Sequence, residues 1–413
     1  MRILQINSCH YRRGGADVVY LNTCEMLEQK GHTVFCFTQQ LPDNEINKYS
    51  SFCPKVNDFR KGSFVKKVAS VPSFIYNQNV KKKLKSFITF SKPEIAHLHL
   101  FLGSLSVSIL DALNELNIPV ISTIHDYRLL CPAYNFLDGR NKVCELCKDG
   151  IYLRCSLKRC SLDHKLSHST MLALDAYYRK YFINPINKID YFIFVSNFSR
   201  NKHIEFNQYY ENKSSVLYNF NRNSINRFYS ARGDYFLYIG RLSQEKGIDT
   251  LINAIQNINV KLKVVGIGPL KEKYQNRCYE NIDFLGFKSG EALWELISKS
   301  SFVIVPSECY ENNPMSIVEA FSFGKPVIGA NVGSIPEIVF DSENGYVFEP
   351  RNIESLAKTI TNASNISDEK YFNLSLSAFN FAQENFNPKN YYQHLINIYN
   401  CVIKNKITIM QNK

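Results

Sequence analysis

Short apolar runs alternate with amphipathic helical segments twice along this 413-residue chain, and this alternation limits the possible folds more than any other feature. The first series contains candidate strands at 2–8, 32–38, 94–100, 119–125, 191–196 and 214–220. The second contains candidate strands at 235–239, 262–265, 282–285, 302–305 and 326–328. Strands separated by helices form parallel sheets that are covered on both faces. The sequence therefore predicts an α/β protein with two doubly wound, Rossmann-like domains in tandem.

A polar stretch with little apolar periodicity, residues 221–234, separates the two series and predicts a linker. The expected domains follow from it in order: 1–222 with a Cys-rich insert at 131–160, a linker at 223–234, a second domain at 235–385, and a helix at 386–413 that crosses back to the first domain. The cleft between two such domains is the usual place for a ligand.

Composition is ordinary for a globular protein, with 45% hydrophobic and 21% charged residues. No apolar run is long enough to span a membrane, and the N-terminal "MRILQINS" predicts a first strand rather than a signal peptide. A cytoplasmic location is therefore expected. The net charge, 49 − 37 = +12, favours anionic partners, namely nucleic acid, an anionic membrane surface or a phosphorylated ligand.

Residues 64–90 alternate apolar and basic clusters, including Lys81, Lys82, Lys83 and Lys85. Two interpretations remain open. The segment is either a solvated helix face or a surface that contacts the anionic inner face of a membrane. No zinc finger, helix-turn-helix or aromatic ribonucleoprotein motif accompanies the positive charge. Nucleic acid is therefore not an expected partner.

Two glutamates, Glu311 and Glu319, follow a buried strand of the second series. Eight residues turn a helix by roughly 800°, so the two carboxylates would not share one helix face. Glu311 is therefore expected in a loop and Glu319 in the next helix, with Pro314 in its first turn and Asn312 and Asn313 as capping residues. This strand–loop–helix unit is how α/β proteins build a ligand site at the carboxyl end of a sheet.

Glycines and cations follow other strands. Arg241 and Lys246 lie on a loop that starts at Gly240 and leads into a helix, an arrangement that suits a diphosphate; the alternative is a basic surface loop. The pair Gly14 and Gly15 precedes another helix and can host an anion, but it lacks the spacing of a dinucleotide fingerprint.

Gly266 and Gly268 form a tight turn after a further strand. His125 stands beside an aspartate at the carboxyl end of its strand, so it is either an oriented base or part of an ordinary loop. His97 and His99 alternate along the neighbouring strand and are interpreted as structural.

Three motifs together resemble a known family. "GRLSQEKG" at 240–247 and the E-x(7)-E pattern at 311–319 resemble the retaining glycosyltransferases of family 4, the glycosyl transferases of group 1. "HDYRLLCP" resembles the branch of that family used for bacterial surface polysaccharides. The resemblance covers most of the chain and is weakest at 51–90 and 131–188. It implies the GT-B fold, with two Rossmann-like domains facing across a cleft.

The resemblance also implies an activity. The expected enzyme is a metal-independent hexosyltransferase that moves a hexose from a nucleotide diphosphate sugar, a UDP- or GDP-sugar, to a hydroxyl of a glycan or lipid-linked acceptor with retention. Arg241 and Lys246 would stabilise the leaving diphosphate. Glu311 and His125 would contact the sugar, and Glu319 would hold the ribose. Further donor-binding positions that it implies are Gly14, Gly15, Gly240, Gly266, Gly268, Asn312, Asn313, Met315 and Ser316.

The twelve cysteines have no export signal beside them, so a disulfide framework is not expected. Cys144, Cys147, Cys155 and Cys160 lie in one short polar segment, and their spacing fits a structural zinc site in which Cys131 can replace one ligand. Nearby cations are expected to lower the thiol pKa values; they are Lys148, Arg154, Lys158 and Arg159. The alternative is a loop with free thiols.

Three rival functions stay open at this point. A basic, metal-stapled nucleic-acid-binding protein would use the charge and the cysteines. An inactive glycosyltransferase-like scaffold is disfavoured because Arg241, Lys246, Glu311 and Glu319 are all present. A sugar synthase or phosphorylase would act on a soluble acceptor, whereas the basic region at 64–90 favours a lipid-linked one.

Overall fold

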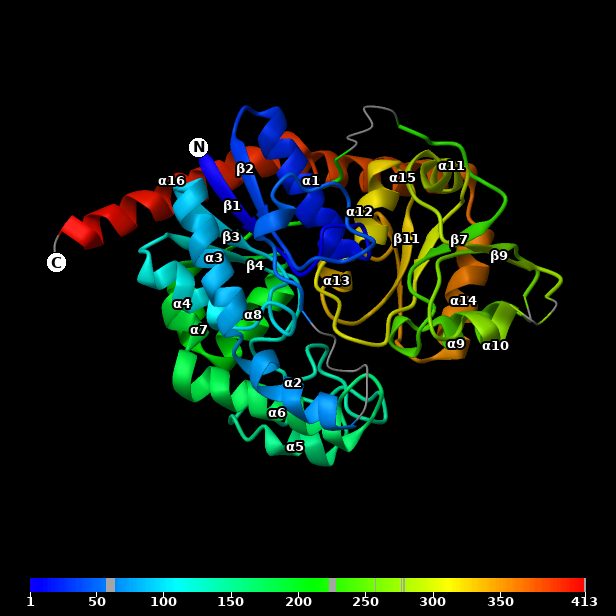
Figure 1. The fold of residues 1–413 in the computed structure, drawn as a ribbon. Coiled ribbons are helices and arrows are strands. Elements are labelled where there is room, and N and C mark those ends of the chain that lie inside the picture. Colours follow the sequence, from blue (N-terminus) through cyan, green and yellow to red (C-terminus); the bar gives the residue numbers. More distant parts are fainter. Residues whose placement is uncertain (57–63, 223–227, 257, 276, 278, 412–413) are drawn as a thin grey trace. The chain divides into compact units, whose positions relative to one another are not determined.

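The computed structural model divides into two compact units and describes all residues except 57–63, 223–227, 257, 276, 278 and 412–413 (Figure 1). Unit 1 comprises residues 1–195, 199–217 and 392–413, and unit 2 comprises 196–198 and 218–391. Each unit contains one six-stranded parallel sheet, which confirms the predicted fold class. Part of the expected linker, 223–227, lies outside the described residues.

The sheet of unit 1 has the strand order β2-β1-β3-β4-β5-β6. Its strands are β1 (Arg2–Ile6), β2 (Thr33–Phe37), β3 (Ile95–Leu98), β4 (Val120–Ile124), β5 (Tyr191–Phe194) and β6 (Ser214–Val216). The order reverses between β1 and β3, and ligands of doubly wound folds bind beyond the carboxyl ends of strands at such a switch point.

Helices connect these strands, and nearly all of the residues in these helices belong to unit 1. They are α1 (Gly15–Gln29), α2 (Phe64–Ile75), α3 (Gln78–Ser91), α4 (Ser108–Glu115), α5 (Leu153–Leu157), α6 (Leu166–Tyr178), α7 (Pro185–Lys188) and α8 (Asn197–Phe206). Gly31, just beyond α1, has φ +83°, the left-handed conformation in which a glycine commonly ends a helix.

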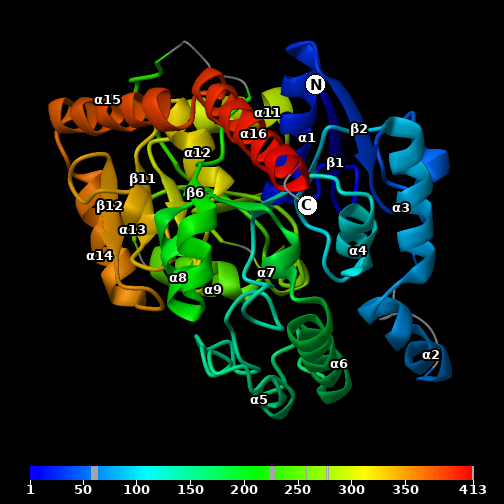
Figure 2. The same ribbon diagram turned by 90° about the vertical axis from the view of Figure 1, so that its left-hand side faces the viewer.

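The last helix, α16 (Pro388–Gln411), starts within unit 2, and its residues from Tyr392 onward belong to unit 1 (Figure 2). The Tyr392 hydroxyl is 2.9 Å from Nε2 of His32, and Lys406 forms an ion pair of 2.9 Å with Asp190. Tyr399 is fully buried. The C-terminal helix thus contributes core side chains to the first sheet.

Unit 2 has the strand order β12-β11-β10-β7-β8-β9. Its strands are β7 (Phe236–Ile239), β8 (Leu262–Val265), β9 (Ile282–Gly286), β10 (Val303–Val305), β11 (Val327–Ala330) and β12 (Gly345–Phe348). The sequence did not predict β12, because the apolar run of this edge strand is only three residues long, Tyr346 to Phe348. Here the switch point lies between β7 and β10.

The helices of unit 2 cover a large apolar core. They are α9 (Ile248–Ile255), α10 (Lys271–Gln275), α11 (Gly290–Ser298), α12 (Met315–Ser322), α13 (Ile335–Ile338), α14 (Ile353–Ser364) and α15 (Asp368–Asn385). Phe302 and Phe321 are fully buried in this core, and each such side chain stabilises the fold by about 1.5–3 kcal/mol. Within the described residues, no helix is both long and apolar enough to cross a membrane.

Candidate active site

The loops that leave β7 and β10 meet at the switch point of unit 2. The first loop carries Arg241 and a short 3-10 helix that ends at Lys246. Gly247 then adopts φ +68°, and a Cβ atom there would lie 1.7 Å from the carbonyl oxygen of Pro306 on the second loop. Only glycine allows this approach, so Gly247 brings the cationic loop against the loop that carries Glu311.

Lys246 and Glu311 form the central ion pair of this site. The Lys246 Nζ and Glu311 Oε1 atoms are 2.6 Å apart, and the Ser307 hydroxyl donates to the same Oε1 atom at 2.5 Å. The Lys246 side chain is 33% exposed and that of Glu311 is 11% exposed. Burial alone would lower the pKa of Lys246, but the Glu311 carboxylate raises it well above its usual value. The ammonium therefore stays charged.

The backbone around Glu311 is fixed by the loop after β11. Gly333 has φ +63°, and a Cβ atom there would lie 2.5 Å from the Glu311 nitrogen. The Ser334 N–H donates to the Glu311 carbonyl oxygen at 3.0 Å. No sequence signal pointed to Ser307 or Gly333, since neither belongs to a motif.

The start of α12 differs from the expectation. Pro314 is the residue before the helix and not part of its first turn, and no side chain caps the helix. Asn313 instead binds Asn219, whose N–H donates to Asn313 Oδ1 at 2.9 Å and whose side-chain amide donates to the Asn313 carbonyl at 3.0 Å. Asn312 is buried, while Met315 and Ser316 are partly exposed at the helix start.

Glu319 lies inside α12, as predicted, and is partly exposed. Burial raises the pKa of Glu319 to about 7. In the described part of the chain its carboxylate has no hydrogen bond or ion pair, and the exposed Arg241 guanidinium likewise has none. Both groups are available to a ligand on the same unit.

Gly266 and Gly268 hold the turn after β8 against the β7 loop. A Cβ atom on Gly266, which has φ +141°, would lie 1.8 Å from the Gly240 carbonyl oxygen, and one on Gly268 would lie 2.3 Å from that of Leu242. Both glycines are required by this packing. Their contact with a donor stays a prediction.

In unit 1, Gly14 and Gly15 are exposed at the N-terminus of α1. The buried Asp17 of its first turn fixes the preceding loop, because it accepts hydrogen bonds from Asn7 at 2.9 Å and from Arg13 at 3.2 Å. The loop leaves β1, one of the two strands at the switch point of this unit. Anion binding here stays a prediction.

His125 follows β4 and faces a pocket that Asp126 and Arg128 also line. Its Nε2 atom is 2.9 Å from Nδ1 of His99. The carboxylate of the neighbouring Asp126 accepts from the Arg128 backbone N–H at 2.9 Å. Burial lowers the pKa of His125 to about 3. Burial therefore favours the neutral imidazole.

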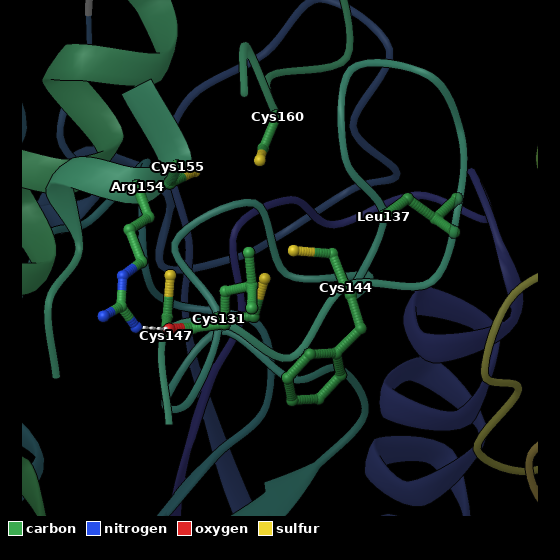
Figure 3. Close-up of a pocket in the computed structure, with 9 residues that line it drawn as sticks. Cys131, Leu137, Cys144, Cys147, Arg154, Cys155 and Cys160 are labelled. Atoms are coloured by element: carbon green, nitrogen blue, oxygen red, sulfur yellow. Dashed lines mark hydrogen bonds between the residues drawn. The ribbon is translucent and has the colours of Figure 1, made fainter. Parts of the chain in front are cut away.

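The Cys-rich insert brings five thiols to one pocket. Cys155 reaches it from α5, and Cys131, Cys144, Cys147 and Cys160 reach it from loops and turns (Figure 3). Across the described residues, no three His, Cys, Asp or Glu side chains stand in an arrangement that could hold a metal ion. The zinc site stays a prediction.

Arg154 and Lys158 act on the thiol pKa values in the expected direction, but burial outweighs them at most of the cysteines. Burial raises the pKa of both Cys131 and Cys147 to about 12. Only the pKa of Cys160 is lowered among the five, by the hydrogen bond from Cys155. The cations are bound by carboxylates: Lys148 by Glu205 at 2.5 Å, Arg154 by Asp149 at 2.8 Å and Lys158 by Asp138 at 3.4 Å.

The basic cluster on α3 is also partly neutralised. Lys81 and Lys85 lie 2.6 and 2.7 Å from the two oxygens of Glu115, and Lys83 donates to the Cys53 carbonyl at 3.3 Å. Lys82 is exposed. These contacts favour the solvated helix face for α3. The side chains of 64–68, at the start of the predicted segment, are outside the part that the structure describes.

Comparison with known proteins places the chain in a family. The family model described as Glycosyltransferase Family 4 matches residues 13–220, and the model described as Glycosyl transferases group 1 matches residues 225–379. Together these matches cover nearly all of both units.

Curated relatives agree with this assignment. An uncharacterized glycosyltransferase of Methanocaldococcus jannaschii is 35% identical over 190 residues, which is 45% of this chain and 51% of that protein. The chain thus spans about half the length of that relative. An uncharacterized 42.6 kDa protein in the cps region of Klebsiella pneumoniae is 25% identical over 91% of this chain and 96% of its own.

Solved structures share the fold at low identity. A glycosyltransferase from Rickettsia africae aligns with a TM-score of 0.66 and 19% identity, covering 98% of each chain. Anabaena HepE in complex with UDP-glucose aligns with a TM-score of 0.62 and 19% identity over 96% of this chain and 98% of that chain. The chain has the GT-B fold and belongs to the group 1 glycosyltransferases of family 4.

Proposed function

We propose that this glycosyltransferase moves a hexose from a nucleotide diphosphate sugar to a hydroxyl of a glycan or lipid-linked acceptor, with retention, in polysaccharide biosynthesis. The observation that carries the proposal is the Lys246–Glu311 ion pair at the switch point of unit 2, beside the exposed Arg241. Sugar transfer concentrates negative charge on the departing diphosphate, and preorganised cations are the main means of stabilising it.

Each carboxylate has a separate role in this proposal. Glu311, held by Lys246 and Ser307, accepts hydrogen bonds from donor-sugar hydroxyls near the reacting carbon. Glu319, on α12, accepts from the ribose hydroxyls and is available for this because the described residues give it no other partner. His125 of unit 1 contacts the sugar.

The reaction breaks the bond between the anomeric carbon and the diphosphate oxygen and forms one to the acceptor oxygen on the same face. The acceptor proton passes to the leaving phosphate oxygen, so no dedicated base is required. His125 suits a binding role because it stays neutral. The cations Arg241 and Lys246 take the place that a divalent ion has in metal-dependent transferases.

The donor and the acceptor are supported by the relatives. Anabaena HepE holds UDP-glucose, which favours a UDP sugar over a GDP sugar. The Klebsiella pneumoniae relative belongs to a cps region, which favours a polysaccharide product.

Thermal-shift screening against UDP, GDP, dTDP and ADP sugars tests the donor assignment. Binding stabilises the folded state by RT ln(1 + [L]/Kd), so a donor present at a hundred times its Kd adds about 2.7 kcal/mol. Lys246→Ala should lose the shift. No stabilisation of the wild type by any nucleotide sugar would contradict the proposed function.

A further inference from the structure

Glu308 places a buried carboxylate in the loop after β10, three residues before Glu311. Its Oε1 atom accepts from the Thr250 hydroxyl at 2.6 Å, and its Oε2 atom lies 3.4 Å from the Arg351 Nε atom. Its backbone N–H donates to the Glu245 carbonyl oxygen at 2.9 Å. One residue thus joins three separate segments of unit 2 beside the proposed site.

The segment that Glu308 holds is the one that carries Lys246. Glu245 directly precedes Lys246, and Thr250 follows it by four residues, within α9. Between them Gly247, with φ +68°, joins the short 3-10 helix to α9. Glu308 therefore fixes the chain on both sides of Lys246, through its backbone N–H on one side and through its carboxylate on the other.

The Arg351 guanidinium offsets the charge of Glu308. Its Nη2 atom is also 3.4 Å from the Glu308 carbonyl oxygen, and Arg351 precedes α14, which packs beside α9 (Figure 1). Replacing a buried ion pair by apolar side chains of similar volume is often neutral for stability or stabilising. The directional contacts of Glu308 are therefore better explained by the position that they impose than by the stability that they add.

We propose that Glu308 is a positioning residue, which holds Lys246 where the departing diphosphate requires it. The inference rests on the proposed function, in which Lys246 stabilises the negative charge of that group. Glu308 acts through its contacts with Glu245 and Thr250 and does not touch the substrate. A displacement of about 1 Å in a group that acts in the transition state can lower the rate about 10²-fold.

Steady-state kinetics separate this role from a direct contact with the donor. Glu308→Ala should lower kcat about 10²-fold and leave KM for the donor sugar within about threefold, because the charge on the diphosphate develops in the transition state. Thr250→Val removes one hydroxyl and keeps the side-chain shape, so it should lower kcat about tenfold. Tyr371→Phe is the matched control. It also removes one buried hydroxyl of unit 2, which donates to the Ser301 carbonyl at 2.8 Å, and should leave kcat and KM unchanged.

A double-mutant cycle tests whether Glu308 acts through Lys246. Residues that work as one unit have non-additive effects on turnover. In a Lys246→Ala background, Glu308→Ala should therefore lower kcat far less than it does in the wild type. Equal losses in the two backgrounds would overturn the inference, because Glu308 would then affect turnover independently of Lys246.

Amide hydrogen exchange separates the inference from the proposed function, because it requires no donor. Glu308→Ala and Thr250→Val should both speed the exchange of backbone amides in 244–251, the segment that they release, whereas Tyr371→Phe should not. Exchange in this segment that neither variant alters would overturn the inference even if the wild type transfers sugar. Faster exchange, in a protein whose wild type neither binds nor transfers any nucleotide sugar, would overturn the proposed function and confirm only that Glu308 holds the segment.

Discussion

At the residue scale, Lys246 has an anionic partner already and is still accessible to a second one. It lies 2.6 Å from Glu311, and a third of its side chain is exposed. A diphosphate that approaches from the exposed side meets a cation held in place by a carboxylate it need not displace. Pairing with Glu311 thus fixes the position of the ammonium, and the exposed Arg241 supplies the net positive charge of the site.

Lys246→Ala and Arg241→Ala should each lower turnover by about 10²–10³-fold, the usual effect of removing one group that stabilises developing charge. The fold should remain intact, which circular dichroism checks. Lys273→Ala is the matched control, because Lys273 also pairs with a carboxylate of unit 2, Asp249 at 2.8 Å, and lies on α10. Turnover of both site variants within threefold of the control would exclude the diphosphate role.

Glu319 gives the site a pH dependence. Burial raises its pKa to about 7, so the carboxyl is protonated below that pH and ionised above it. A ribose hydroxyl donates more strongly to the ionised form. The affinity for UDP-glucose, which has no group that titrates near pH 7, should therefore rise between pH 6 and pH 8.

Glu319→Gln should bind UDP-glucose more weakly at pH 8 and show no such rise, as isothermal titration calorimetry would measure. The same raised pKa means that the folded wild type binds more protons than the unfolded chain, so its stability falls as pH increases through about 7. An identical pH profile of binding for wild type and Glu319→Gln would exclude the ribose contact.

At the scale of elements, the apolar patterns predicted eleven of the strands because buried parallel strands are nearly continuous apolar runs. They missed β12, whose four residues lie at a sheet edge. Motif spacing located the loops of Arg241 and Glu311. It could not reveal the hydrogen bond from Ser307 to Glu311 or the close approach of Gly247 to Pro306. Both contacts depend on how the loops of the folded chain meet.

The same limit applies to the cysteines and histidines. Spacing predicted that four thiols of the insert lie together, and all four line one pocket. It could not predict that carboxylates bind the neighbouring cations. His97 and His99 were interpreted as structural from their alternation along β3. That alternation could not predict their contacts with Gln5 and Tyr399, because these two residues come from other elements.

We predict a structural zinc ion in the Cys-rich insert. In its part from 143 to 157 the large apolar side chains are mostly exposed, including Leu153 at 54% and Leu157 at 75%. Such a segment has little buried apolar surface to order it, and zinc bound by thiolates would supply the missing free energy. Binding would draw the sulfurs of Cys144, Cys147 and two of the remaining three together.

Elemental analysis of protein purified without added metal should find about one zinc per chain. The double variant Cys144→Ser and Cys147→Ser should lose the zinc and melt at a lower temperature. Cys401→Ser serves as the control, because Cys401 is exposed on α16 and far along the chain from the insert. Less than about a tenth of a zinc per wild-type chain would leave the thiols without a metal role.

At the scale of the whole molecule, the proposed function requires that the charge that stabilises the diphosphate comes from the protein's own cations. The sequence contains no Asp-x-Asp triplet of the kind that bridges a metal ion to a diphosphate. Transfer should therefore continue in excess EDTA, measured as release of the nucleoside diphosphate. Complete loss on chelation with recovery on adding manganese or magnesium would contradict this; recovery with zinc alone would point to the insert.

To reach a lipid-linked acceptor, the protein would have to contact a membrane with part of its surface. The basic cluster on α3 is a weaker candidate for membrane contact than its sequence predicted, since Lys81 and Lys85 are paired with Glu115. Exposed large apolar side chains gather instead in 143–182, among them Tyr181 at 66% and Phe182 at 74%. Lysines and arginines accompany them along the same segment. Apolar groups beside cations match an anionic bilayer surface.

The protein should therefore sediment with vesicles that contain anionic lipid and less with neutral ones, and added salt should release it, since each basic residue near such a surface contributes about 1 kcal/mol. Leu157→Ser with Phe182→Ser should weaken the binding more than replacing Lys81, Lys82, Lys83 and Lys85 by Gln. Phe372→Ser is the control, because Phe372 is 45% exposed on α15 of unit 2. Equal partitioning of the wild type into neutral and anionic vesicles would exclude the electrostatic part, and unaltered binding of the Leu157 and Phe182 double variant would exclude this surface.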